Sequence, residues 1–328
     1  MPNYNGVWSL VTQYQYAADW NADNPNFIPP RGIFFTGQDA GGSPVKNIDF
    51  ITITTTGNAS DFGDIDQNRE EFRGAFGSST RGVLGGGLQG DPLDLIQFVT
   101  IATTGNASTF GDLLTGTYAG SGASSETRGL FFGGNNDGAN TDVIEYVTIA
   151  STGNSQDFGN LSLARRWSSS AGSTTRILTG GGSSVANPFP RYNTIDYVTI
   201  ASTGNATDFG NLSNAVQAPA AVSSSTRTAF GGGYDGTNVI NNIDYVTTAS
   251  TGNASDFGDM TATSMDGMGT SNKTRGVFAG GFSSGSNAIV NVIQYITIAN
   301  TGNASDFGDL TAARQKSAAC SSVHGGIA

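Results

Sequence analysis

Few residues of this 328-residue chain could support catalysis. Its one histidine is His324 and its one cysteine is Cys320, so a nucleophile paired with a histidine base could form only near the C-terminal end. A single residue of each type excludes a multi-histidine metal site and an intramolecular disulfide. His324 also stands where the repeat described below has an arginine, which indicates a structural position. We expect no enzymatic activity.

Pairs of aspartates around a Phe-Gly step recur along the chain, and such pairs could act on a glycosidic bond or bind calcium. They are Asp61/Asp64, Asp256/Asp259 and Asp306/Asp309. A glycosidase needs two carboxylates that face each other across one sugar, whereas a pair that recurs in several repeats belongs to the fold. The spacing also lacks the alternating acids of an EF-hand loop. We predict turn-capping and strand-end roles, no cofactor and no metal site, with calcium binding as the open alternative.

An internal repeat of about 49 residues dominates the sequence. The string Thr-Gly-Asn recurs with its glycine at Gly57, Gly105, Gly153, Gly204, Gly252 and Gly302. Each copy is followed by a Phe-Gly step, with the phenylalanine at Phe62, Phe110, Phe158, Phe209, Phe257 and Phe307. An arginine before a short apolar stretch recurs at Arg31, Arg81, Arg128, Arg176, Arg227 and Arg275. The sequence therefore contains six units.

Each unit predicts four short strands. One is the apolar stretch that ends at glycines, and another is β-branched and aromatic on both faces, as in residues 290–299. The Phe-Gly step begins a third strand, and a Ser/Ala-rich stretch suits an innermost strand near a crowded axis. Four strands per unit and six units predict an all-β, six-bladed β-propeller. The chain starts and ends mid-blade, so we expect a C-terminal strand to close the ring.

The repeated polar residues have structural interpretations. We expect the asparagine of Thr-Gly-Asn to bond its own backbone in a turn. We expect the six repeated arginines to pair with an acid or amide beside the aromatic of each unit. Those partners would be Asp49, Gln97, Glu145, Asp196, Asp244 and Gln294. We expect the phenylalanines of the Phe-Gly step to pack between blades.

Loops after the glycine pair differ between units in length and composition, and they should emerge on one face of the ring. They span residues 38–46, 88–94, 135–142, 183–192, 234–242 and 282–290. Loops on a rigid scaffold often carry recognition. The candidate recognition residues are Phe189, Arg191, Tyr192, Tyr234 and Asp235. Aromatics beside polar groups suit a sugar, and ordinary blade-to-blade loops are the alternative.

Residues 1–28 lack the repeat marks, and we treat them as a segment separate from the propeller of residues 29–328. Their candidate attachment residues are Tyr4, Trp8, Tyr14, Tyr16 and Trp20. Tyrosine and tryptophan are favoured interface anchors, so the segment could dock on another protein. Packing on the chain's own propeller is the alternative.

Composition limits the partners. The net charge of −11 argues against a general nucleic-acid or anionic-membrane binder, which needs a basic face. No apolar run approaches the roughly 18 residues of a membrane helix. The first residues carry no basic region of a signal peptide, so we expect synthesis in the cytoplasm.

The order of marks in a unit resembles the kelch repeat, with phenylalanine in place of the usual tryptophan. The marks are a strand ending in Gly-Gly, an Ile-acid-Tyr step, an aromatic such as Phe307, and Leu310-Thr-Ala-Ala-Arg314. An arginine in the last step occurs only at Arg165 and Arg314, with Arg69 nearby. The near-identical units, and an opening with Gly6-Val7-Trp8, resemble kelch-like virion structural proteins of tailed phages, especially marine ones that infect cyanobacteria.

The resemblance implies a virion component such as a tail fibre, appendage or surface protein, present in multiple copies. Its partners would be other virion proteins, through residues 1–28, and a host cell-surface glycan. A kelch-type glycan-binding module or adhesin without a virion role is the alternative.

Overall fold

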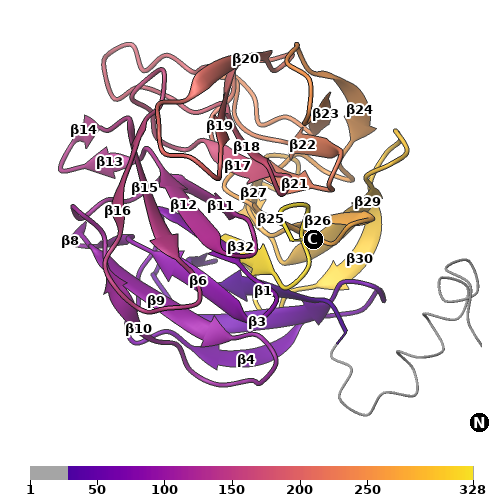
Figure 1. Ribbon diagram of the computed structural model, residues 1–328. Helices are drawn as coiled ribbons and strands as arrows, with labels where there is room; N and C mark the ends of the chain where they lie inside the picture. The colour runs from indigo at the N-terminus through magenta and orange to yellow at the C-terminus, as the bar shows by residue number, and fades with distance from the viewer. Residues whose placement is uncertain (1–28, 328) are drawn as a thin grey trace, which may run out of the picture.

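The computed structural model describes residues 29–327, which form a ring of six four-stranded antiparallel sheets (Figure 1). Among these residues there is no helix. The chain is therefore an all-β six-bladed propeller, as its repeats predict. The candidate attachment residues Tyr4, Trp8, Tyr14, Tyr16 and Trp20 lie outside the described residues.

The innermost strand of each blade is short and built mainly from small residues, because six strands converge around the axis. From blade 1 to blade 6 these strands are β32 (Ala318–Ser321), β5 (Gly74–Gly77), β11 (Ser121–Ser124), β17 (Ser169–Gly172), β21 (Ala220–Ser223) and β25 (Met268–Ser271). Each contacts the inner strands of both neighbouring blades, and β32 contacts β25 and β5.

Three further strands follow outward in each blade. The second strands are β1 (Arg31–Phe35), β6 (Arg81–Gly85), β12 (Arg128–Phe132), β18 (Arg176–Gly180), β22 (Arg227–Gly231) and β26 (Arg275–Ala279). The third strands are β3 (Asn47–Thr52), β9 (Leu95–Thr100), β15 (Val143–Thr148), β19 (Thr194–Thr199), β23 (Asn242–Thr247) and β29 (Val292–Thr297). The outer strands are β4 (Ser60–Asp64), β10 (Ser108–Asp112), β16 (Gln156–Asn160), β20 (Thr207–Asn211), β24 (Ser255–Asp259) and β30 (Ser305–Asp309).

The C-terminal strand closes the ring. In blade 1, β32 pairs antiparallel with β1, with Ile33 opposite Cys320 and Phe35 opposite Ala318. Figure 1 shows yellow β32 beside indigo β1. The predicted closure by a C-terminal strand is confirmed.

The antiparallel order divides the connections between two faces. The loop face carries the loops between second and third strands and the segments that enter each blade from the previous one. Its short strands are β2 (Gln38–Asp39), β7 (Leu88–Gln89), β8 (Asp91–Pro92), β13 (Asn135–Asn136), β14 (Ala139–Asn140), β27 (Phe282–Ser283), β28 (Ala288–Ile289) and β31 (Arg314–Gln315). The turn face carries the turns between first and second strands and the Thr-Gly-Asn turns. Strand β1 begins at the turn face, and His324 of the C-terminal tail lies there, with Nε2 3.0 Å from the Gly77 carbonyl.

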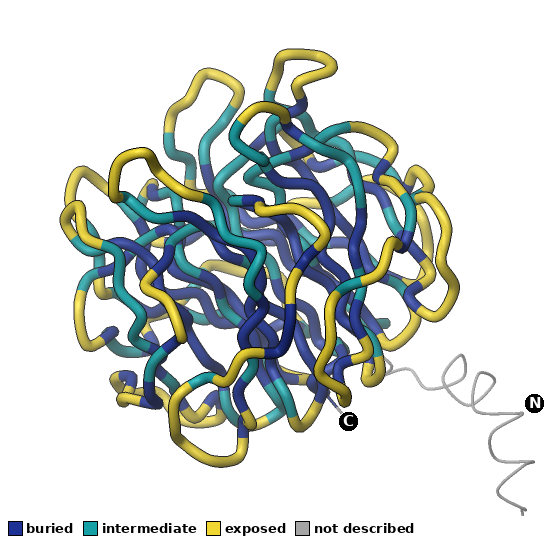
Figure 2. Tube along the Cα trace, turned by 90° about the horizontal axis from the view of Figure 1, so that it is seen from above, coloured by how far each residue is buried: buried dark blue, intermediate teal, exposed yellow. Residues whose placement is uncertain are grey.

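The phenylalanines of the Phe-Gly step are core residues between blades, as predicted. Phe209 is 2% exposed and packs in one cluster with Leu178 of its own blade and Val246 of the next. Its ring meets that of Tyr197 edge-on, with centroids 5.9 Å apart. Figure 2 shows buried residues along the blades and exposed residues at the loop tips.

The Thr-Gly-Asn segments join neighbouring blades, and the prediction that their asparagines bond their own backbone is wrong. Asn106 Oδ1 accepts a hydrogen bond from the backbone N–H of Asp64, on the outer strand of the previous blade, at 3.0 Å. The Gly105 N–H donates to the Phe62 carbonyl on the same strand at 2.7 Å. A Cβ on Gly63 would lie 2.4 Å from the Gly105 carbonyl oxygen, so this close approach requires glycine. The outer edge of each blade is thereby paired with the next blade.

The six repeated arginines also join blades, and the prediction that they pair with the acids is wrong. The Arg176 guanidinium lies 4.6 Å from the centroid of Tyr197, and its Nη1 donates to the Ala249 carbonyl of the next blade at 2.7 Å. The other five stack and donate in the same way. A backbone carbonyl is present in every blade whatever its side chains, which explains why the repeat keeps the arginine but not the acid.

Candidate recognition surface

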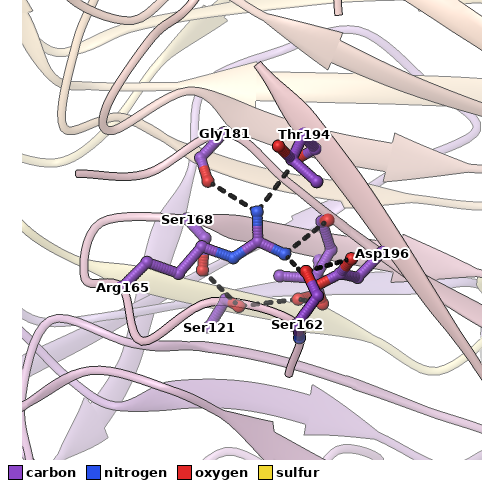
Figure 3. A network of polar contacts seen from close by, with 9 residues as sticks. Ser121, Ser162, Arg165, Ser168, Gly181, Thr194 and Asp196 are labelled. Atoms are coloured by element: carbon purple, nitrogen blue, oxygen red, sulfur yellow. Dashed lines mark hydrogen bonds and ion pairs between the residues drawn. The ribbon is translucent and has the colours of Figure 1, made fainter. Parts of the chain in front are cut away.

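The acids bind a different set of arginines, which are buried on the segments that enter each blade. These arginines hold the entry segments and the third strands together beneath the loop face. Arg165 Nη2 lies 2.7 Å from Asp196 Oδ2, and both side chains are fully buried (Figure 3). Arg165 Nη1 also donates to the carbonyls of Gly181 and Thr194. The Ser162 hydroxyl donates to the same carboxylate. Burial lowers the pKa of Arg165, and the charge of Asp196 opposes that shift.

We call this buried contact between the entry segment and the third strand the lock of its blade, and its residues differ between blades. Arg314 bonds Asp49 at 2.8 Å, Arg69 bonds Gln97 at 2.6 Å, and Arg73 bonds Glu145. Blades 5 and 6 have no arginine at this lock: Ser213 donates to Asp244 and Thr261 donates to Gln294. The buried amide or acid is thus used in every blade, while its partner differs.

Above these locks, each blade carries three residues side by side on the loop face, which we call its row. The first lies on the blade-entry segment, the second follows the glycine pair, and the third lies on the returning part of the loop. The rows are Gln315–Gln38–Pro44, Glu70–Leu88–Pro92, Tyr118–Asn135–Asn140, Arg166–Ser183–Arg191, Gln217–Tyr234–Val239 and Met265–Phe282–Ile289. Directly opposed residues of paired strands project to the same side.

The rows share their backbone pairing but not their chemistry. Blade 6 has the apolar Met265, Phe282 and Ile289, whereas blade 4 has two arginines. The fold needs only the backbone bridges, so it does not dictate these side chains. A rigid frame with variable side chains on one face is the arrangement expected of a recognition surface.

The structure brings several of the predicted recognition residues together across blades 4 and 5. The Arg191 guanidinium lies 5.0 Å from the centroid of Tyr234. Phe189 is 49% exposed, with φ of 61°, and Tyr192 is half-buried. Arg191 and Tyr234 are row residues, so sequence reasoning found part of two rows.

Hydrogen bonds hold the Tyr234–Asp235 loop in one shape. The Tyr234 hydroxyl donates to the Gly236 carbonyl at 2.8 Å. Asp235 Oδ1 accepts from the backbone N–H groups of Asn238 and Thr237, each at 2.7 Å. These bonds lower the pKa of Asp235, so its carboxylate stays ionised. Arg191 covers one face of the Tyr234 ring.

An axial cavity of about 110 Å³ opens at the centre of the loop face, and sequence reasoning missed it. It is ringed by six non-glycine residues with φ of 50–57°, one from each blade. They are Glu71, Ala119, Trp167, Ala218, Asp266 and Lys316. The N–H of each donates to the carbonyl of the member before it, and Glu71 donates to Lys316, so six backbone bonds close a circle. Their types share no mark in the sequence, because the circle uses only backbone groups.

Negative charge exceeds positive charge at this cavity. Lys316 Nζ lies 2.7 Å from Glu71 Oε1 and 3.9 Å from Glu70 Oε2. Burial, with the charges of Glu71 and Glu70, raises the pKa of Asp266 from 3.8 to about 6. Burial also raises the pKa of Glu70.

The residues considered for catalysis lie apart from this surface. Cys320 is buried in the inner strand β32, and burial raises the pKa of its thiol. His324 Nε2 lies near the Ser124 hydroxyl at the turn face, and burial lowers its pKa. Each aspartate pair lies on one outer strand, on either side of its Phe-Gly step. Within residues 29–327 no three histidine, cysteine or acidic residues gather as a metal site.

Comparisons with known proteins assign no family to the chain. No protein-family model matches it, and no curated protein is similar to it in sequence. In the part of the chain that the structure describes, no helix is long and apolar enough to cross a membrane.

Proposed function

We propose that the chain is a non-enzymatic structural protein of a tailed-phage particle, a fibre, appendage or surface protein, whose loop face recognises a host surface or another protein. The observation that carries the proposal is the contrast between the frame and the rows. Every blade keeps the stacked arginine, the buried Phe-Gly phenylalanine and the inter-blade asparagine, while the six rows differ. Such a scaffold is suited to protein–protein recognition.

The kelch-like marks and the near-identical sequences of the units support a place in the virion. The direction of the chain supports an attachment role for residues 1–28, because β1 begins at the turn face, opposite the rows. Attachment through that segment would leave the loop face free. We expect the protein in several copies, with other virion proteins as partners and no nucleic acid or membrane among them.

A glycan-binding module or adhesin without a virion role is the second candidate. The exposed ring of Phe189 beside Arg191 and Tyr192 favours it, because aromatic rings pack on sugars while polar groups bond their hydroxyls.

Immunogold labelling tests the proposal. Antibodies against residues 29–328 are applied to purified particles of the phage that encodes the chain. We expect gold on the capsid or tail, and no gold on particles assembled with a chain that lacks residues 1–28. Label confined to unassembled protein would contradict a virion role. Normal incorporation of a folded ring without residues 1–28 would contradict attachment through that segment.

A further inference from the structure

Two arginines of the loop face differ from all others between residues 29 and 327. Every other arginine donates a hydrogen bond through its guanidinium group, to a carbonyl or a side chain. Arg166 and Arg191 donate none to a described residue and form no ion pair with one. Both belong to the row of blade 4, in a chain with a net charge of −11.

The backbone holds the two arginines on either side of Ser183. Arg166 and Ser183 exchange backbone hydrogen bonds of 3.1 and 2.9 Å. Bonds from Ser184 to Pro190 and from Tyr192 to Gly182 pair Ser183 with Arg191 on its other side. All three side chains project to one side of this small sheet. The Ser183 side chain is 1% exposed, and its hydroxyl has no partner among the described residues.

Aromatic rings fix both guanidinium groups in advance. Arg166 Cζ lies 3.7 Å from the centroid of Trp167, and Arg191 Cζ lies 5.0 Å from that of Tyr234. The Nε atoms are buried without partners. Stacking restrains the plane of a guanidinium and leaves its terminal N–H groups to donate. The charge of Arg191 acts on the carboxylate of Asp235, but Asp235 Oδ1 accepts hydrogen bonds from two backbone N–H groups and forms no ion pair with the arginine.

We propose that the row of blade 4 binds the carboxylate or sulfate group of an acidic glycan, an inference that rests on the proposed recognition role. The guanidinium groups donate charge-assisted hydrogen bonds to the anion. The exposed Phe189 ring, two residues from Arg191, offers an apolar surface to the sugar. That ring favours a glycan over an acidic peptide, which would use only the charges.

Calorimetric titration of the full chain tests the inference. The probes are a galacturonate hexasaccharide and a sulfated galactan hexasaccharide, each with its uncharged counterpart, the methyl ester or the unsulfated sugar. We expect at least one acidic probe to bind. Its uncharged counterpart should bind at least about tenfold more weakly. Arg166→Gln and Arg191→Gln should each weaken the acidic probe about tenfold. Lys273→Gln, which removes an exposed charge from the turn face, is the matched control and should change nothing.

Three results would overturn the inference: no binding of any acidic probe, equal binding of acidic and uncharged probes, or undiminished binding by both arginine variants. Tighter binding of a hexaglutamate peptide than of either acidic sugar would assign the site to acidic peptides and also overturn it. Melting temperatures of the variants exclude unfolding as a cause. The proposed function is tested separately. Binding of an acidic probe without immunogold label on particles would contradict only the virion role. Label on particles without such binding would contradict only this inference.

Discussion

Replacing Arg165 by methionine removes the guanidinium that ties the entry segment of blade 4 to its third strand. The side chain is fully buried and bonds Asp196 at 2.7 Å and the Thr194 carbonyl at 2.9 Å. Methionine fills similar space without charge. The Asp196 carboxylate would stay buried, with only the hydrogen bonds from Ser162 to compensate it.

The expected loss of stability is about 3–5 kcal/mol, the usual cost of removing one partner of a buried ion pair. Blade 6 indicates how the loss can be reduced. There Ser264 occupies the position of Arg165, and the buried partner is the uncharged amide of Gln294, which accepts from Thr261. Adding Asp196→Asn to Arg165→Met removes the unpaired charge, so the double variant should be more stable than Arg165→Met alone. The coupling between the two sites should be about 1–3 kcal/mol.

Urea unfolding, followed by circular dichroism at pH 7, measures these differences. Arg166→Met is the matched control, because the adjacent arginine only stacks on Trp167 and should cost about 1 kcal/mol or less. Equal losses of stability in the two methionine variants would contradict the role of the Arg165–Asp196 ion pair. Additive effects of Arg165→Met and Asp196→Asn, without coupling, would contradict it as well.

Three further predictions concern closure, core and pH. Deleting residues 316–328 removes β32, the inner partner of β1, and should lower the melting temperature sharply; an unchanged value would contradict closure. Phe209→Ala should cost about 3–5 kcal/mol in urea unfolding, whereas Phe189→Ala, at an exposed site, should cost about 0.5 kcal/mol or less; equal losses would contradict the core role. The pKa of Asp266 is about 6 in the folded state and near 3.8 in the unfolded chain. Between these two pH values the folded state therefore holds a proton that the unfolded chain has released. The contribution of Asp266 to stability should therefore rise by up to about 3 kcal/mol from pH 8 to pH 4. Asp266→Asn should be more stable than wild type at pH 8 and should lose this part of the rise. An unaltered pH profile in this variant would refute the assignment.

The propeller could be predicted because its marks act through local backbone geometry. Gly63 and its counterparts are needed wherever two blades approach, so the same residue recurs at the same phase. The apolar third strand and the small inner strand likewise follow from burial that repeats in every blade. Closure followed from the incomplete blades at the two ends of the repeat array.

Partners across blades could not be predicted in the same way. The repeated arginines bond backbone carbonyls of the next blade, which no residue type marks, and the acids take partners that change from Arg165 to Ser213. The rows join residues whose separations along the sequence vary with loop length. Of the row residues, only Arg191 and Tyr234 were therefore predicted as recognition residues. The circle around the axial cavity uses backbone groups of unrelated residues such as Trp167 and Lys316.

We propose that the repeated frame is structural and that the variable loop face is the recognition surface of a particle-bound ring. Under the proposed virion role, electron cryomicroscopy of purified phage particles tests this most directly. The predicted result is a six-bladed ring on the particle surface, with its turn face toward the particle and its rows outward. A ring whose loop face is buried against the particle, or particles without any such ring, would contradict the account.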